Sequence, residues 1–380
     1  MELQKYINEN NDYLTQFKEH KLFVRKYSKL GLCIVKGHYN QKYDYENNPW
    51  MRYCRGAVID INTNSVVCVP PRKANISYLM NDPNEQRFIY NPENKEIGDI
   101  REVFNEFNES KTYEPLFDGT MINMFYHNDE WKFSTRSNIG AKNSWDGKMS
   151  FLNMFLEVNG EEWINNLNKD YCYSFVLHHV NNRNVSPIEQ NMIILVENHK
   201  IENKTIEKIP LCEIEDICNI FNLTKEMLQG YNHSNLVFSI KGFTIKTGTT
   251  RINWLNPNFE YVKHLKMNHN DKYLNYISLK QKRLLSQYLL YFPEDRYLFE
   301  EYREEFNNIK QLLYSRYVSR FIKKEIDTKD IEYPLKPLIY ELHNHYKESG
   351  EKINMKVVSD YMHNLDGKKM MFIRNYLTNE

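Results

Sequence analysis

The sequence predicts an α+β protein in which an N-terminal domain of twisted antiparallel sheets precedes an all-helical C-terminal domain. Three observations lead to this prediction. Segments before about residue 257 alternate apolar and polar side chains with period two, as strands do. Beyond residue 258, apolar residues recur at helical spacing and glycine becomes scarce. The 380 residues suffice for two domains, which we place at 1–257 and 258–380.

Composition narrows the classes of function. Lys plus Arg is 50 and Asp plus Glu is 50, so any nucleic-acid site has to be a local basic patch. No apolar run approaches the ~18 residues of a membrane span, and the first residues do not resemble a signal peptide. We therefore expect a soluble, intracellular protein with no membrane partner. The six cysteines lack CxxC spacing, which predicts buried free thiols rather than a metal or redox site.

The first elements follow in chain order. Residues 2 to about 19 are predicted as an amphipathic helix, and 22–27 and 32–38 as strands. The stretch 53–73 predicts a hairpin whose turn lies at 62–65. A polar stretch follows, with a short helix expected near 99–108.

A second hairpin is predicted within residues 113–143. An Asp-Gly pair at 118–119 opens an alternating run, 127–130 form a polar turn, and the return strand ends at Arg136. Further on, we expect a helix at 145–166, strands at 173–178, 191–196 and 238–246, and three or four helices after residue 258.

Several of these segments together resemble the covalent nucleotidyltransferases: DNA ligases, RNA ligases and mRNA capping enzymes. The closest resemblance is to the RNA ligase 1 family in the version found among large DNA viruses. That family carries Lys-x-Asp-Gly-Thr-Met-Ile and Ala/Ser-Thr-Arg-Ser-x-Ile-Gly, and this chain has LFDGTMI at 116–122 and STRSNIG at 134–140. Arg55, Lys73 and Asn75 match the family's Arg-Gly hairpin. The resemblance covers nearly the whole chain and implies an ATP-grasp-like ligase domain over 1–257.

The catalytic motifs, however, are damaged. In the family, a lysine amine attacks the α-phosphate of ATP, carboxylates hold divalent metal ions, and lysines of the last motif neutralise phosphate charge. Leu116 occupies the position of the nucleophilic lysine. His178 and Lys241 stand where the superfamily has carboxylates, and Asn253 stands at a lysine position. Losses at four separate catalytic positions predict a pseudoenzyme.

The resemblance still implies contacts to a nucleotide or RNA for a set of mostly basic residues. These residues are Arg55, Lys73, Asp118, Gly119, Arg136, His178, Arg183, Lys241, Lys246 and Arg251. A solvated surface charge is the alternative for each basic residue, and for Lys246 we favour it. Asp118 is equally well explained as a turn-capping carboxylate.

We therefore expect a catalytically degenerate RNA ligase-like protein that binds a nucleotide, an RNA end or a cap, or that serves as a viral structural or assembly partner. If it is viral, we expect it in the host cytoplasm or the virion. The helical domain is where a protein partner could bind, and no cofactor or metal is expected. The alternative is an active ATP-dependent RNA ligase that uses ATP, Mg²⁺ and a displaced lysine. Lys73 is the better candidate for that role, because Lys111 lies an odd number of residues from Leu116 on the same strand. A scaffold with an empty cleft is a third possibility.

Overall fold

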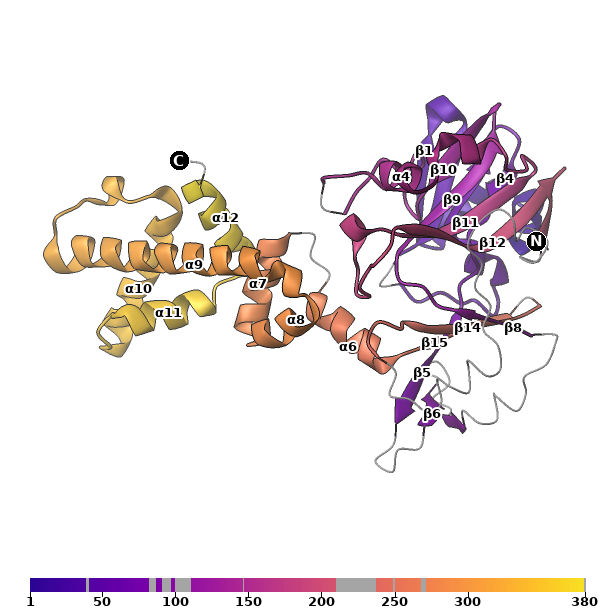
Figure 1. Ribbon diagram of the computed structural model, residues 1–380. Coiled ribbons are helices and arrows are strands. Elements are labelled where there is room, and N and C mark those ends of the chain that lie inside the picture. The colour runs from indigo at the N-terminus through magenta and orange to yellow at the C-terminus, as the bar shows by residue number, and fades with distance from the viewer. Residues whose placement is uncertain are drawn as a thin grey trace. The chain divides into compact units, whose positions relative to one another are not determined.

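The computed structural model describes residues 1–38, 41–81, 87–90, 97–99, 111–145, 147–209, 237–248, 250–267 and 271–378. The chain divides into two compact units, Met1–Tyr261 and Val262–Glu380 (Figure 1). The first unit is built from β-sheets and the second from helices, which confirms the α+β prediction. The boundary between the units falls inside helix α6 (Pro257–Lys266).

Sheet A consists of four antiparallel strands in chain order: β1 (Leu22–Tyr27), β2 (Leu32–Gly37), β3 (Arg55–Asp60) and β4 (Ser65–Cys68). The single helix expected at 2–19 is instead two helices, α1 (Glu2–Glu9) and α2 (Tyr13–Glu19). Asn10 separates them because its backbone is extended (φ −130°, ψ 99°). The apolar faces of both helices pack on sheet A through Leu3 and Phe17.

Sheet C has the strand order β10-β9-β11-β12-β13. Its strands are β9 (Thr120–His127), β10 (Glu130–Ser134), β11 (Tyr171–His178), β12 (Met192–Glu202) and β13 (Thr205–Ile209). The expected hairpin is formed by β9 and β10, and its turn residues Asn128 and Asp129 both have positive φ (52° and 61°), as a two-residue hairpin turn requires. Helix α4 (Phe151–Ile164), shorter than expected, covers one face of this sheet (Figure 1).

Sheet B has the described order β7-β6-β5-β15-β14-β8. Its strands are β5 (Asn75–Asn81), β6 (Arg87–Tyr90), β7 (Ile97–Asp99), β8 (Lys111–Pro115), β14 (Gly242–Thr247) and β15 (Thr250–Leu255). One pair departs from the antiparallel pattern, because β15 pairs with β5 in parallel. Sheet C lies between these two strands in the sequence, and a connection of that length permits a parallel pair. Apart from Asp99, which ends β7, the helix expected near 99–108 lies outside the described residues.

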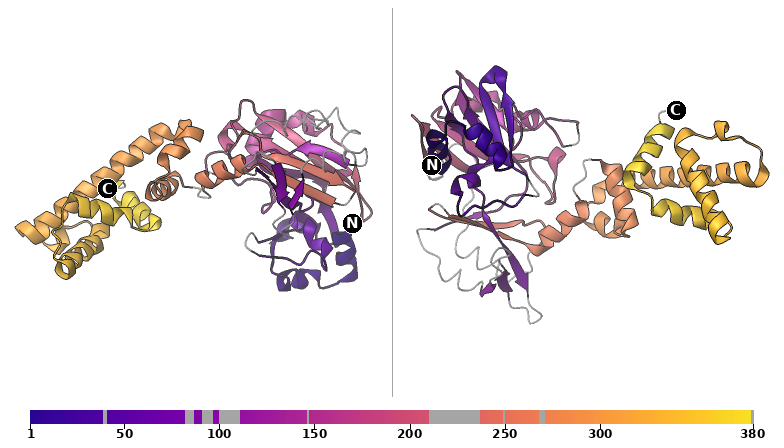
Figure 2. Two further views of the ribbon diagram at one scale, coloured as in Figure 1. Left: turned by 90° about the horizontal axis from the view of Figure 1, so that it is seen from below. Right: turned by 180° about the vertical axis from the view of Figure 1, so that it is seen from behind.

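The second unit is helical throughout its described part. Its α-helices beyond α6 are α7 (Lys272–Gln281), α8 (Leu285–Tyr291), α9 (Arg296–Tyr317), α10 (Lys336–Ser349), α11 (Met355–His363) and α12 (Gly367–Thr378). The long helix α9 continues into a π-helical turn, η6 (Val318–Lys323), and packs against α10 and α11 (Figure 2). Tyr273, Tyr276 and Tyr302 form much of its core.

Short 3₁₀ turns connect these elements: η1 (Ser28–Leu30), η2 (Pro49–Tyr53), η3 (Val180–Asn182), η5 (Pro293–Asp295), η7 (Thr328–Asp330) and η8 (Tyr333–Leu335). Cys33, Cys54, Cys68 and Cys172 are buried free thiols, as expected, whereas Cys212 and Cys218 lie outside the described residues. No helix in the described part of the chain is long and apolar enough to cross a membrane.

Candidate functional site

Asp118 lies between β8 and β9 and holds a distant loop in place. Its Oδ2 atom accepts hydrogen bonds from the backbone amides of Val185 (2.7 Å) and Ser186 (3.1 Å). Only 7% of the Asp118 side chain is exposed. The hydroxyl of Ser186 in turn donates to the carbonyl of Ser239 (2.8 Å). Asp118 is therefore a capping carboxylate, but it caps the loop after β11 rather than its own turn, and its second oxygen is left facing Lys241.

Gly119 is required for the close approach of β9 to β11. A Cβ atom at this position would lie 2.4 Å from the carbonyl oxygen of Leu177 and 2.7 Å from a methyl carbon of Val176. No larger side chain fits without moving a strand. The Asp-Gly pair of the predicted motif thus has a packing role here, and it places Asp118 beside the end of β11, where His178 lies.

His178 and Lys241 both lie near Asp118. The Lys241 ammonium donates to the carbonyl oxygen of Phe117 (3.2 Å) and lies 4.0 Å from Oδ1 of Asp118. His178 Nε2 is buried and has no hydrogen-bond partner among the described atoms. Burial lowers the pKa of His178, and the charge of Asp118 only partly opposes that effect, so the imidazole is neutral near pH 7. The backbone amide of Leu116 donates to the carbonyl of Gly242 (2.9 Å), which fixes the chain just after β8 against sheet B.

Arg183 contributes to the shape of the same loop. Its guanidinium donates from Nε and from a terminal nitrogen to the carbonyl oxygen of Val185, at 3.3 and 3.1 Å. Because Val185 also donates its amide to Asp118, both residues hold one short turn. Asp118, Gly119, His178, Arg183 and Lys241 thus lie near one another, and Asp118 and Arg183 fix the conformation of the loop after β11.

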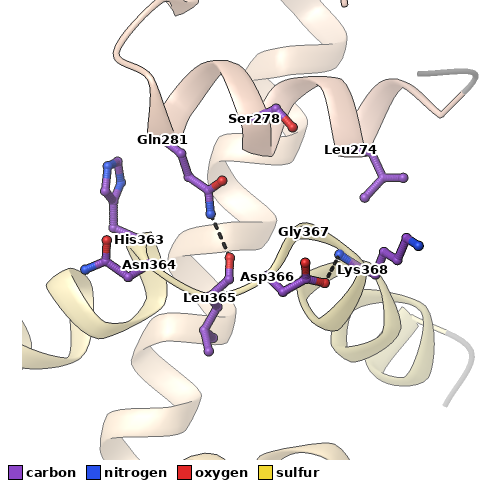
Figure 3. A pocket seen from close by; sticks show the side chains of 9 residues that line it. All are labelled: Leu274, Ser278, Gln281, His363, Asn364, Leu365, Asp366, Gly367 and Lys368. Carbon is purple, nitrogen blue, oxygen red and sulfur yellow. Dashed lines mark hydrogen bonds between the residues drawn. The ribbon is translucent and has the colours of Figure 1, made fainter. Parts of the chain in front are cut away.

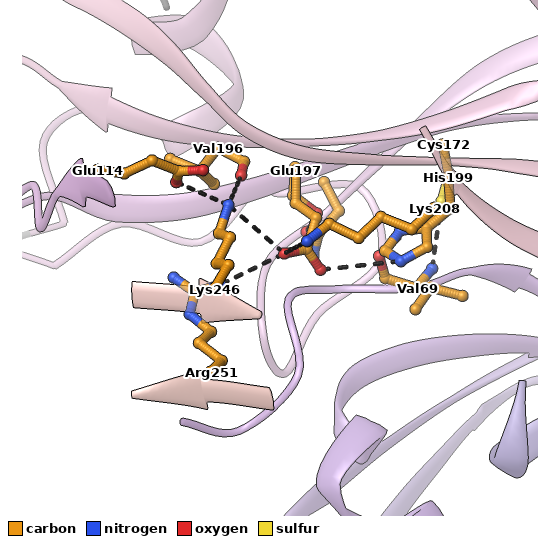
Figure 4. Close-up of polar contacts among 11 residues, drawn as sticks. Val69, Glu114, Cys172, Val196, Glu197, His199, Lys208, Lys246 and Arg251 are labelled. Atoms are coloured by element: carbon orange, nitrogen blue, oxygen red, sulfur yellow. Dashed lines mark hydrogen bonds and ion pairs between the residues drawn. The ribbon is translucent and has the colours of Figure 1, made fainter. Parts of the chain in front are cut away.

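Lys246 has a different environment from the one expected. Instead of a solvated surface charge, its side chain is 6% exposed and lies within β14 (Figure 4). Its ammonium lies 2.6 Å from Oε2 of Glu114 and 3.7 Å from Oε2 of Glu197, and it donates to the carbonyl of Val196 (2.7 Å). Arg251 reaches the same Glu197 oxygen at 3.5 Å. We call Glu114, Glu197, Lys246 and Arg251 the buried ion network.

The buried ion network joins sheet B to sheet C. Lys246 and Arg251 are register partners on β14 and β15, and Glu114 lies on the neighbouring strand β8. Glu197 belongs to β12 of sheet C, where a bulge between Ser174 and Phe175 shifts the register beside it. Lys246 and Arg251 therefore hold sheet B against sheet C through Glu197. Sequence reasoning missed both glutamates, because their pairing depends on strands that are far apart in the chain.

The charge state of Glu197 follows from its neighbours. Burial by itself would raise the pKa of this carboxyl, but Lys246, His199, Arg251 and Lys208 together lower it to about 2. For Lys246, burial lowers the ammonium pKa and the two glutamates raise it. We take the ammonium as charged, because two carboxylates lie within 4 Å of it, at 2.6 and 3.7 Å. Glu197 is ionised throughout the neutral range.

A second group of cations lies where strands β2 and β3 of sheet A meet the segment after β10. Lys36 of β2 pairs in register with Arg55 of β3, and a Cβ atom on Gly56 would lie 2.7 Å from the Cα atom of Arg136. We call Lys36, Arg55 and Arg136 the basic cluster. The Arg136 side chain reaches solvent, but nearby protein atoms partly desolvate its guanidinium, and this desolvation lowers its pKa. The pKa of Lys36 is lowered by burial and by the charge of Arg136. Among the described residues, no carboxylate forms an ion pair with any of the three.

Lys73 packs on an aromatic ring instead of joining these groups. Its ammonium lies 4.4 Å from the centre of the Tyr45 ring, and the guanidinium carbon of Arg52 lies 4.9 Å from the same centre. Arg52 also donates to the side-chain oxygen of Asn75 (2.9 Å). The Lys73 amide donates to the carbonyl of Arg52 (2.8 Å), so Lys73 and Asn75 are linked through Arg52.

The described residues do not fit a divalent metal ion at the position where the family resemblance implies one. No group of three or more His, Cys, Asp or Glu side chains suited to a metal ion occurs in the described part of the chain. Near Asp118, the ammonium of Lys241 occupies the space beside the carboxylate. A second cation there would meet like charge rather than a ligand.

The helical unit contains a concavity of about 500 Å³ between α7 and the α11–α12 turn (Figure 3). Its polar groups stabilise that turn. Gln281 donates to the carbonyl of Leu365 (2.7 Å), and the Asp366 carboxylate accepts from the amides of Lys368 and Lys369 at the start of α12. This arrangement is that of a helix cap, and it points to no particular ligand.

Comparisons with known proteins add little. No protein-family model matches the chain, and no curated protein matches it. Among solved structures, it is similar to a putative ATP-dependent DNA ligase from Aquifex aeolicus, with 12% sequence identity and a TM-score of 0.41 over 90% of this chain and 81% of that chain. Similarity at this level carries no argument about function.

Proposed function

We propose that the first unit is a ligase-like nucleotidyltransferase fold that has lost catalysis and binds a phosphate group, carried by a nucleotide, an RNA end or a cap. The proposal is supported by the order of the motifs along the strands and by the residues that replace the catalytic ones. It follows most directly from one observation, the distribution of charge in the first unit.

The buried carboxylates around the candidate site have cationic partners. Asp118 lies beside Lys241, and Glu114 and Glu197 are bound by Lys246. The basic cluster is the reverse case, because Lys36 and Arg55 are cross-strand neighbours, the charge of Arg136 acts on Lys36, and no carboxylate in the described part of the chain forms an ion pair with any of the three. Like charges held together in this way are unfavourable unless an anion joins them. Three clustered cations suit a phosphate group, and arginine binds phosphate with two parallel hydrogen bonds.

Loss of catalysis follows from Leu116. Its side chain has no heteroatom and cannot form a bond to phosphorus, and its backbone is held in sheet B by the bond to Gly242. Lys241 adds a positive charge where an active enzyme of this type would have a carboxylate. Both changes act on the same step, the transfer of an adenylate to the protein.

The binding proposal is tested with Arg136→Gln, which removes one charge of the basic cluster. We expect calorimetric titration of a 5′-phosphorylated RNA oligonucleotide to show weaker binding to the variant by about 1.5–3 kcal/mol, the range for a hydrogen bond to a charged group. For the wild-type protein, the logarithm of affinity should fall with the logarithm of salt concentration by about 0.7 per phosphate neutralised.

Lys29→Gln, on the exposed 3₁₀ turn η1, is the matched control for loss of one positive charge. Equal binding by the wild type, Arg136→Gln and Lys29→Gln would contradict the assignment of the basic cluster. Absence of binding to both the phosphorylated RNA and ATP would contradict the proposed function itself.

The loss of catalysis is tested with radiolabelled ATP and with Leu116→Lys. We expect no covalent label on the wild-type protein and no appreciable sealing of nicked RNA by the variant. The lysine restores the nucleophile, but Lys241 and His178 remain where the family has carboxylates that bind metal ions. Each missing electrostatic element costs about 10²–10³ in rate. A stable adduct mapped to Lys73 would instead support the alternative of an active ligase with a displaced nucleophile.

A further inference from the structure

We infer that the ammonium of Lys241 takes the place of a divalent cation in the site around Asp118, so that the chain supplies its own cation and meets a phosphate ligand without metal. The role in phosphate binding rests on the proposed function. The assignment of a cation position does not, because it follows from the geometry of three neighbouring groups.

Two protein oxygens lie near the Lys241 ammonium. The carbonyl oxygen of Phe117 lies 3.2 Å from Nζ of Lys241, and Oδ1 of Asp118 lies 4.0 Å from it. The two oxygens come from adjacent residues and face the same point. Oδ2 of Asp118 is held by the amides of Val185 and Ser186, so the carboxylate cannot rotate to place Oδ1 elsewhere. A fixed carbonyl and a fixed carboxylate oxygen are typical ligands of Mg²⁺, Ca²⁺ and Mn²⁺.

A carboxylate at position 241 would favour a bound divalent cation. Together with Asp118 and the Phe117 carbonyl, it would supply a third oxygen ligand, and two neighbouring carboxylates favour a bound cation between them. Lysine at this position removes the need for a metal ion, because its single charge balances that of Asp118 and its ammonium donates to the Phe117 carbonyl. The wild-type protein should therefore have no use for a divalent ion here.

The inference is tested by Lys241→Glu, with melting temperature measured in EDTA and in MnCl₂. We expect Mn²⁺ to raise the melting temperature of this variant by several degrees and to leave that of the wild-type protein unchanged. Lys29→Glu carries the same charge reversal on an exposed turn and should show no response to Mn²⁺. The double variant Asp118→Asn with Lys241→Glu should lose the response, since it lacks one proposed ligand.

A second variant keeps the test decisive if Lys241→Glu does not fold. Lys241→Ala removes the ammonium, and we expect propylammonium to restore part of its melting temperature. Tetramethylammonium has the same charge but no N–H donors, so it should have no effect. A folded Lys241→Glu protein without any response to Mn²⁺, or Lys241→Ala that responds equally to both organic cations, would overturn the inference.

The proposed function and the cation role of Lys241 can be tested separately. If Lys241→Glu responds to Mn²⁺ but neither protein binds phosphorylated RNA, the cation position is correct and the proposed function is wrong. If the wild-type protein binds the RNA in EDTA while Lys241→Glu shows no response to Mn²⁺, the proposed function stands and the role of Lys241 is overturned. When both hold, binding of the RNA by Lys241→Glu should be weak in EDTA and should recover with Mn²⁺.

Discussion

Replacement of Lys246 by methionine should lower the free energy of unfolding by about 3–5 kcal/mol, the cost of breaking a buried ion pair from one side. Methionine fills a similar volume but leaves Glu114 and Glu197 buried without their ammonium, and the Val196 carbonyl loses a donor. Urea unfolding followed by circular dichroism measures the difference. A comparable loss is not expected at Lys208, which also lies near Glu197 but is 41% exposed, so Lys208→Met should cost about 0–1 kcal/mol.

Neutralising Glu114 should reverse much of this loss. With Glu114→Gln added to Lys246→Met, the Glu114 charge is removed while Glu197 keeps Arg251 at 3.5 Å and Lys208 at 3.8 Å, so no carboxylate of the network is left without a cation. If Lys246→Met were as stable as Lys208→Met, the ammonium would not be bound as described. The sheets would then be held together by packing alone.

Acidification should remove stability that depends on Glu197. The pKa of this carboxyl is about 2 in the folded protein, against an ordinary value of 4.5. A lowered folded pKa means that the contribution is fully present above about pH 4.5 and is lost as the pH falls from there toward 2. The difference corresponds to about 3 kcal/mol at neutral pH.

The measurement is the urea midpoint of the wild-type protein and of Glu197→Gln between pH 7 and pH 2. We expect the wild type to lose its stability more steeply below about pH 4.5, since the variant has no carboxyl to protonate at this position. Parallel pH profiles for the two proteins would show that Glu197 has an ordinary pKa and that the buried ion network contributes little.

Local patterns in the sequence predicted the hairpins and the α+β class because the relevant interactions are between near neighbours. The period-two run and polar tip of β9 and β10 are sufficient to specify an antiparallel pair. The parallel pair of β5 with β15 was not predictable in this way, because no local pattern selects a partner across so long a stretch of sequence. The break at Asn10 was missed because the apolar spacing continues across it.

The candidate site shows the same division. Asp118 and Gly119 were found as a motif, and the structure gives each a physical role in the loop after β11. Lys246 was expected on the surface because its sequence neighbours do not reveal the two glutamates that surround it. Lys36 was overlooked altogether, since its importance comes only from its register with Arg55. The ionic contacts that determine which side chains can meet a ligand thus join residues far apart in the sequence, and local patterns do not reveal them.

The central claim is that the first unit binds phosphate without a metal ion and without covalent chemistry. The most direct test is calorimetric titration of ATP into the wild-type protein, once in EDTA and once in excess MgCl₂. We predict binding in EDTA that salt weakens, and an affinity in Mg²⁺ that is equal or lower because the metal screens the triphosphate. Binding that appears only when Mg²⁺ is present would contradict the claim, because it would require a group of metal ligands that the described residues do not supply.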